Sequence, residues 1–291
     1  MLLSTETGGL RIKYDDKIAI KMIKDAGFDA FDYSFCYLKG QPEKDMLDDN
    51  YIERAHELRA YADEIGIVCN QSHAPLDFKY TDETDLSNEN FLRNVRAIEV
   101  ASILGAKSII FHGLGIVYAH DIDYIEYNTK YLRSYLPYCE KYNMKISYEN
   151  SCAISKDMKA IPIPGVHTAE EYMRFIDSLD NRWFNICVDT GHLAVVGMEP
   201  VEFISGLTND YLCALHIHEN DGTRDQHLIP YTLGKFNWDK ITEALKKIDY
   251  KGDFTLESST FFAYIPDELL PSALKYAADL GRLLIKKIEE A

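Results

Sequence analysis

The chain has 291 residues, of which 46% are hydrophobic and 27% are charged. This is the composition of an ordinary globular protein, and the length suits one (β/α)8 barrel, which typically needs about 250 residues. The net charge of −16, from 31 Lys and Arg against 47 Asp and Glu, repels a phosphate backbone and therefore disfavours a nucleic acid as partner.

Short apolar or β-branched segments alternate with amphipathic segments along the whole chain, which predicts strands alternating with helices. The strands are expected at residues 2–6, 28–33, 67–69, 108–111, 145–148, 184–188, 212–215 and 254–256. The helices are expected from about residue 15 to Gly27, and then at 50–66, 87–105, 121–143, 168–180, 199–207, 237–248 and 266–289.

Local signals support several of these boundaries. Thr168 and Glu171 have the spacing of a capping box, and Gly66 and Gly105 stand where helix C-caps belong. Eight strand and helix pairs predict an α/β fold, a (β/α)8 TIM barrel, with a single domain over residues 1–291. An open doubly wound sheet is the alternative, but it binds its ligands at one switch point, where residues from six consecutive strands would not converge.

Histidines and carboxylates recur about once per strand, close to the point where each strand ends. They are His73, His112, Glu149, Asp189, His218 and Glu257. Because helices connecting parallel strands place all strand C-termini on one side, we expect these six side chains to face one another.

Four of the six form a mixed oxygen and nitrogen set that suits a divalent metal ion. Glu149, Asp189, His218 and Glu257 offer three carboxylates and one imidazole. Such a set favours Mn²⁺ or Zn²⁺, with Co²⁺ and Mg²⁺ as alternatives, over a metal that prefers thiolates. No dinucleotide or phosphate-binding fingerprint is present, so no organic cofactor is expected.

Four sequence motifs carry a family resemblance over essentially the whole chain. They are Ser147–Asn150, Val188–His192, His216–Gly222 and Leu256–Glu257. With these motifs the chain resembles the xylose isomerase-like (β/α)8 superfamily, specifically its sugar (phosphate) isomerase/epimerase branch, which includes the ketose 3-epimerases.

The resemblance implies roles for particular residues. It implies that Glu149, Asp189, His218 and Glu257 bind one divalent metal and that His192 and Arg224 contact the substrate. It also implies a homo-oligomer. One departure is Ser155, which stands where ketose 3-epimerases carry a further glutamate, so their particular substrate does not carry over.

The chemistry of two metal-bound glutamates fits proton transfer next to a carbonyl. A metal that polarises both substrate oxygens stabilises an enediolate, and Glu149 and Glu257 would then remove and return a proton from opposite faces. We therefore expect a metal-dependent isomerase or epimerase acting on a small sugar or sugar phosphate, with His73 and His112 in the substrate pocket.

The His216-x-His218 pair raises the question of which histidine reaches the site. We expect the two side chains to point to opposite faces of the strand, with only one of them reaching the barrel interior. The family pattern places the metal-binding imidazole second in the pair, which selects His218. His216 is expected to be a packed, hydrogen-bonded histidine.

The same superfamily contains endonuclease IV-type DNA repair enzymes, whose three zinc ions use nine ligands. This chain has a residue for each of them, namely His73, His112, Glu149, Asp189, His192, His218, Asp225, His227 and Glu257. The acidic net charge and the lack of a glycine-rich first strand count against this alternative. In the sugar enzyme, Asp225 and His227 would bind sugar hydroxyls or a second metal.

A third alternative is a non-catalytic barrel that binds a sugar or serves as a partner subunit, since fold and ligands do not prove turnover. The presence of both Glu149 and Glu257 argues against it. The N-terminal residues lack the basic and apolar segments of a secretory signal, and no long apolar run occurs. We therefore expect a cytoplasmic protein without membrane contact.

Overall fold

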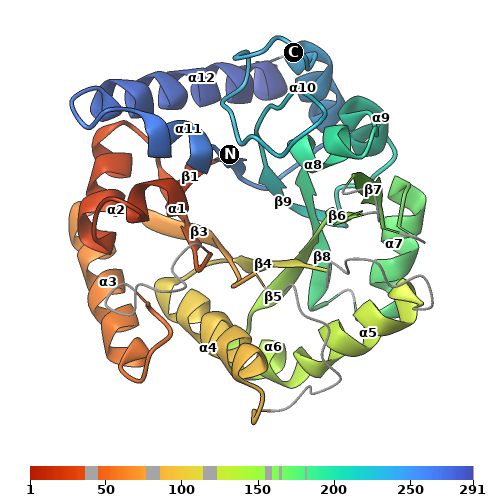
Figure 1. Ribbon diagram of the computed structural model, residues 1–291, viewed down its shortest axis with the longest axis horizontal. Helices are drawn as coiled ribbons and strands as arrows, with labels where there is room; N and C mark the ends of the chain where they lie inside the picture. Colours follow the sequence, from red (N-terminus) through yellow and green to blue (C-terminus); the bar gives the residue numbers. More distant parts are fainter. Residues whose placement is uncertain are drawn as a thin grey trace.

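Eight parallel strands form the centre of the computed structural model, with helices around them (Figure 1). The structure describes residues 1–36, 45–76, 86–113, 123–154, 159–163, 166–180 and 182–290. The central strands are β1 (Leu3–Glu6), β2 (Ala30–Ser34), β3 (Val68–His73), β4 (Ser108–His112), β5 (Lys145–Glu149), β8 (Phe184–Asp189), β9 (Leu212–His216) and β10 (Phe254–Leu256).

The strand order in the sheet is β10-β1-β2-β3-β4-β5-β8-β9, which follows the chain around a circle. The two end strands approach each other at Ile217, whose N–H donates to the carbonyl of Thr255 at 2.9 Å. The carbonyl of Ile217 in turn accepts from the N–H of Glu257 at 3.1 Å. These bonds bring β9 and β10 together, so the sheet forms a nearly closed barrel and the predicted (β/α)8 fold is confirmed.

The helices around the barrel lie close to the predicted ranges. They are α2 (Asp16–Asp25), α3 (Tyr51–Ile65), α4 (Glu89–Leu104), α5 (Tyr124–Ser134), α6 (Leu136–Tyr142), α7 (Ala169–Ser178), α9 (Pro200–Ser205), α10 (Trp238–Lys247) and α12 (Leu270–Glu290). Gly66 and Gly105 are left-handed C-caps, and Thr168 with Glu171 forms the expected capping box. Among the described residues, no helix is both long and apolar enough to cross a membrane.

Some local structure differs from the prediction. The helix expected at 121–143 is two helices, because Pro137 lies in the first turn of α6 and cannot continue α5. Three short helices and a hairpin were not predicted. They are α1 (Gly8–Arg11), α8 (Thr190–Val195), α11 (Ser259–Tyr264), and the pair β6 (Cys152–Ile154) and β7 (Ala160–Pro162).

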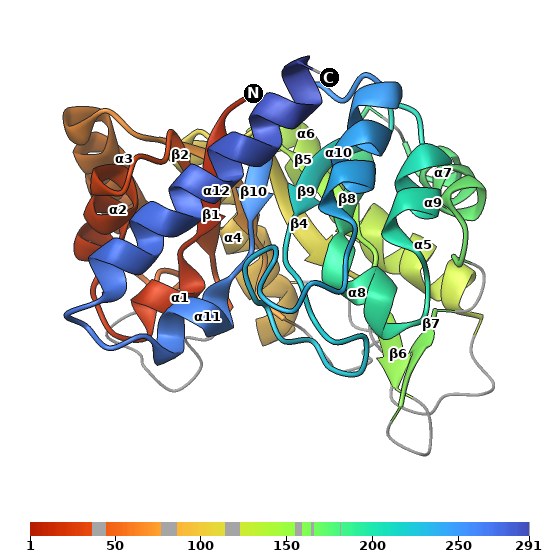
Figure 2. The same cartoon turned by 90° about the horizontal axis from the view of Figure 1, so that it is seen from above.

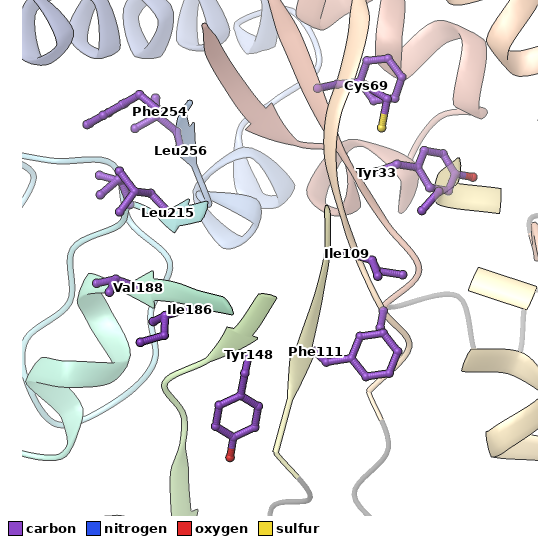
Figure 3. Close-up of a cluster of buried hydrophobic side chains, with 14 of the residues drawn as sticks. Tyr33, Cys69, Ile109, Phe111, Tyr148, Ile186, Val188, Leu215, Phe254 and Leu256 are labelled. Atoms are coloured by element: carbon purple, nitrogen blue, oxygen red, sulfur yellow. The ribbon is translucent and has the colours of Figure 1, made fainter. Parts of the chain in front are cut away.

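Alternation along the strands separates two environments. In Figure 3, side chains such as Ile109, Phe111 and Val188 point away from the barrel axis, and they belong to the main apolar core. The alternate positions point inward. A small separate cluster of Ile110, Cys187 and Ala214 is buried there. Most other inward positions near the strand C-termini are polar, so the interior of this end of the barrel is available for chemistry.

Candidate metal centre and active site

The predicted site residues gather at the C-terminal end of the barrel. In Figure 2 this is the end where α8, α11 and the β6–β7 hairpin lie, since these segments follow β8, β10 and β5. Five of the six residues near the strand ends are buried, and His112 is half-buried; the five are His73, Glu149, Asp189, His218 and Glu257. This placement agrees with the expectation that the six side chains face a common space.

Glu149 lies at the centre of the cluster. Its Oε1 lies 2.6 Å from Nδ1 of His216, and its Oε2 lies 2.5 Å from Nε2 of His112 and 3.6 Å from Nε2 of His73. The two ring nitrogens of His73 and His112 are themselves 3.1 Å apart. Oε2 of Glu149 nevertheless lacks a partner with hydrogen-bond geometry, so this oxygen has capacity for a further ligand.

Asp189 and His218 form a second contact pair, with Oδ2 of Asp189 3.0 Å from Nε2 of His218. The other oxygen of Asp189 accepts from the N–H of His192 at 2.6 Å and thereby caps α8. Gly191 is required here, because a Cβ at this position would lie 1.9 Å from Cε1 of His218. The Val188–His192 motif therefore places Asp189 and makes room for His218.

A third group comes from the loop after β9. Oδ2 of Asp225 lies 3.3 Å from Nε2 of His192 and 2.7 Å from Nε2 of His227. The ring of His227 stacks on that of His218, with centroids 4.3 Å apart. Asp225 and His227 thus join the cluster, as the sequence suggested.

Arg224 is different, because the structure leaves it exposed on the loop. Within the described part of the chain, its side chain forms no ion pair with the cluster. The substrate contact expected for Arg224 remains a prediction. Ser155, the other position where the family pattern bears on the substrate, lies outside the described residues.

The expectation for His216 was wrong in one respect. Residues two apart on a strand share a face, and His216 and His218 both enter the cluster. His216 is indeed fully buried and hydrogen-bonded, but its partners are Glu149 and, through Nε2 at 3.0 Å, Asp32. Asp32 was missed, although a carboxylate at an alternating position of the apolar segment 28–33 is a recognisable signal.

Two further acids were not predicted to matter. Glu6 ends β1, is buried, and has one carboxylate oxygen without a hydrogen-bond partner. Glu219 accepts backbone N–H groups from Lys235 at 2.6 Å and Phe236 at 3.2 Å. The Glu219 carboxylate therefore anchors the loop before α10 and has a structural role.

Electrostatics separate the two predicted catalytic glutamates. Burial acts to raise the pKa of Glu149, but the His216 and His112 imidazoles outweigh it and hold that pKa well below its usual value. Burial, reinforced by the charges of Glu149 and Asp189, raises the pKa of Glu257 well above its usual value. Burial also opposes ionisation of Asp189, yet His192 and His218 lower its pKa to about 2.

The residues present fit a divalent cation. Oε2 of Glu149, Oε2 of Glu257 and Nδ1 of His218 are buried without hydrogen-bond partners, and such atoms are costly unless a ligand satisfies them. Several overlapping trios also have ligand atoms within 4.8 Å of one another, among them His73–His112–Glu149, His192–Asp225–His227 and His218–His227–Glu257. The cluster thus has the donor types and the unsatisfied atoms of a metal centre.

The barrel with a buried histidine and carboxylate cluster at its C-terminal end defines a recognisable class of protein. A sequence model of the family described as xylose isomerase-like TIM barrel matches residues 20–280. The chain belongs to this family.

Solved structures share the fold over nearly the full length at low sequence identity. A D-tagatose 3-epimerase-like protein superposes with a TM-score of 0.75 at 19% identity, covering 100% of this chain and 99% of the other. The IolI protein with a bound zinc atom gives 0.75 at 17% identity, covering 100% of both chains. A D-psicose 3-epimerase determined with D-fructose gives 0.73 at 14% identity, covering 98% and 99%.

One curated sequence relative is also similar over part of the chain. It is the uncharacterized protein y4fM of Sinorhizobium fredii (strain NBRC 101917 / NGR234), with 33% identity over 95 residues. The match covers 31% of this chain and 30% of that protein, which is less than a third of the relative's length.

Proposed function

We propose that this protein is a divalent-metal-dependent isomerase or epimerase of a sugar or sugar phosphate. The observation that carries the proposal is the position of Glu149 and Glu257. Both are buried, each has a carboxylate oxygen without a hydrogen-bond partner, and both approach the same nitrogen of His216. Two glutamates that share a pocket can act on the two faces of one substrate carbon.

Glu149, Asp189, His218 and Glu257 are the residues that would hold the metal. When bound, a divalent cation would polarise the carbonyl and the neighbouring hydroxyl oxygen of a sugar. Mn²⁺ and Zn²⁺ suit the donor set best, with Co²⁺ and Mg²⁺ as alternatives. The zinc atom named for the IolI structure supports a metal of this kind.

The residues of the chain would divide the remaining work. One of Glu149 and Glu257 would accept a proton from the carbon beside the carbonyl, and the other would return a proton to it. His73, His112 and His192 surround the carboxylates and would orient sugar hydroxyls. The roles of the two glutamates exchange in the reverse reaction.

The test uses metal-loaded protein and a panel of ketoses and ketose phosphates in deuterated water. We expect deuterium to enter the carbon beside the carbonyl, and Glu149→Gln and Glu257→Gln to abolish exchange and turnover. Glu99→Gln is the matched control, because Glu99 is a part-buried carboxylate that bonds Tyr51 away from the barrel mouth. Near wild-type rates for either site variant would exclude that residue, and sugar binding without exchange would instead indicate a non-catalytic barrel.

A second candidate function rests on a separate observation. The structure brings together the residues of the nine-ligand set, and the trios His73–His112–Glu149 and His192–Asp225–His227 each have closely spaced ligand atoms. This arrangement would support a zinc-dependent abasic-site endonuclease. Chelator-sensitive nicking of abasic DNA would favour that function, whereas the net charge of −16 leads us to expect no nicking.

A further inference from the structure

Two buried residues lie behind the predicted metal ligands: His216 contacts Glu149 and Glu257, and Asp32 contacts His216 from the other side. Asp32 is on β2 and His216 is the last residue of β9, and both have an exposed fraction of 0%. Oδ2 of Asp32 lies 3.0 Å from Nε2 of His216. Neither ring nitrogen of His216 is therefore open to water.

The other ring nitrogen of His216 faces both glutamates. Nδ1 lies 2.6 Å from Oε1 of Glu149 and 3.3 Å from Oε2 of Glu257. A single N–H at this position can hold the first carboxylate by a hydrogen bond and attract the second. Since two buried carboxylates repel each other, a donor between them reduces the cost of keeping them close.

The orientation of the imidazole is itself fixed from several sides. Nε2 of Gln71 donates to the same oxygen of Asp32 at 2.8 Å, which holds the carboxylate that contacts the ring. The ring of His73 stacks on that of His216, with centroids 5.4 Å apart and planes within 4° of parallel. The His216 ring is therefore held by packing and by acids on both nitrogens.

We propose that Asp32 and His216 are positioning residues, which orient the carboxylates of Glu149 and Glu257 for metal binding and for the proton transfers of the proposed reaction. This inference rests on the proposed function, and it assigns a task to two residues outside the four predicted metal ligands and the predicted substrate contacts. Removing a residue that hydrogen-bonds to a metal ligand and orients it typically weakens metal binding by about 10–100-fold.

The test separates the Nδ1 donor from the bulk of the ring. His216→Leu removes both nitrogens, His216→Asn keeps an amide N–H near the position of Nδ1, and His216→Gln keeps one near that of Nε2. The readout is the affinity for Mn²⁺, titrated without substrate by electron paramagnetic resonance. The kcat and KM for the substrate that the ketose panel identifies are measured alongside.

We expect His216→Leu and His216→Gln to weaken Mn²⁺ binding by about tenfold or more, and His216→Asn to retain most of the affinity. Asp32→Ala should weaken it in the same direction, because the ring loses its anchor. Asp253→Ala is the matched control. Asp253 is a buried aspartate that accepts the N–H of Leu2, just before β1, and it lies at the end of the barrel opposite the site. This control should leave Mn²⁺ affinity unchanged, and thermal unfolding of each variant confirms that it is folded.

The outcomes distinguish this inference from the proposed function. Folded His216→Leu protein with wild-type or tighter Mn²⁺ binding would overturn the positioning role, as would equal losses in His216→Leu and His216→Asn. Wild-type protein that binds no Mn²⁺ would also overturn it. If Mn²⁺ affinity depends on the Nδ1 donor but no sugar is turned over, the positioning role stands and the isomerase proposal fails.

Discussion

Replacing Gly191 by alanine tests how the site is assembled, because the two halves of the Asp189 and His218 pair meet at this glycine. A Cβ on residue 191 would lie 1.9 Å from Cε1 and 2.5 Å from both ring nitrogens of His218. Ordinary van der Waals contact begins at 3.4 Å, so the closest of these contacts is a severe overlap. The imidazole is fully buried, so it can make room only by leaving its place beside Asp189.

The expected magnitude follows from this overlap. Overpacking a buried position typically costs about 1–3 kcal/mol, and each kcal/mol lowers the Tm of a protein somewhat smaller than this one by about 2–4 °C. Gly191→Ala should therefore lower the Tm of metal-free protein by a few degrees. The same substitution should displace His218, a proposed metal ligand, and should therefore weaken Mn²⁺ binding strongly although the fold is only modestly destabilised.

The assay compares thermal unfolding in a chelator with a Mn²⁺ titration. Gly206→Ala is the control, because its Cβ would lie 2.9 Å from Cβ of Ala169, which creates overpacking among the outer helices. It should lower the Tm without changing Mn²⁺ affinity. Unchanged Mn²⁺ affinity in Gly191→Ala would refute the assignment of His218 as a metal ligand.

Three further predictions concern stability. Phe111 is 1% exposed, so Phe111→Ala should cost about 3–5 kcal/mol, measured by urea unfolding; a cost below about 1 kcal/mol would contradict its place in the core. Burial opposes ionisation of Asp29, but the Arg282 guanidinium and the Leu3 N–H lower its pKa below the usual 3.8. The ionised Asp29 carboxylate therefore stabilises the folded protein above pH 3.8, and this stabilisation is lost as the pH falls through the lowered pKa. Asp29→Asn should thus lower the Tm at pH 7 and have a smaller effect at pH 3, and an equal effect at both would be inconsistent with this ion pair. Adding Mn²⁺ to chelator-treated protein at 100 times its Kd should stabilise it by about 2.7 kcal/mol, and thermal unfolding that is insensitive to Mn²⁺ would argue against a metal centre.

The fold was predictable from the sequence because its signals are local. The apolar segments that end at His112 and Asp189 are strands β4 and β8, and the capping pair Thr168 and Glu171 begins α7 where expected. The break between α5 and α6 was also readable, since Pro137 marks it. The short helices α8 and α11 could not be predicted, because so few residues show no helical periodicity and their first turns depend on the strand ends before them.

The site was predictable in part. Strand-end positions identified Glu149 and Glu257, but they could not show that His216 lies between the two, because that contact joins β5, β9 and β10. Asp32 was overlooked for a similar reason, since its role is defined by a histidine far along the chain. The single-domain extent, the cytoplasmic location, the homo-oligomer and the sugar as partner remain predictions.

The contact between β9 and β10, where the barrel closes, determines where the site can open locally. Both hydrogen bonds described there belong to the backbone of Ile217, which stands between His216 and His218, and one of them reaches Glu257. A local fluctuation that breaks these two bonds would free the backbone of Glu257 from β9, while Leu256 stays paired with Thr5 of β1. Release of the proposed metal would then depend on local opening of the sheet between β9 and β10. Once the metal is removed, we expect amide exchange at Ile217 and Glu257 to be faster than in β4 or β5.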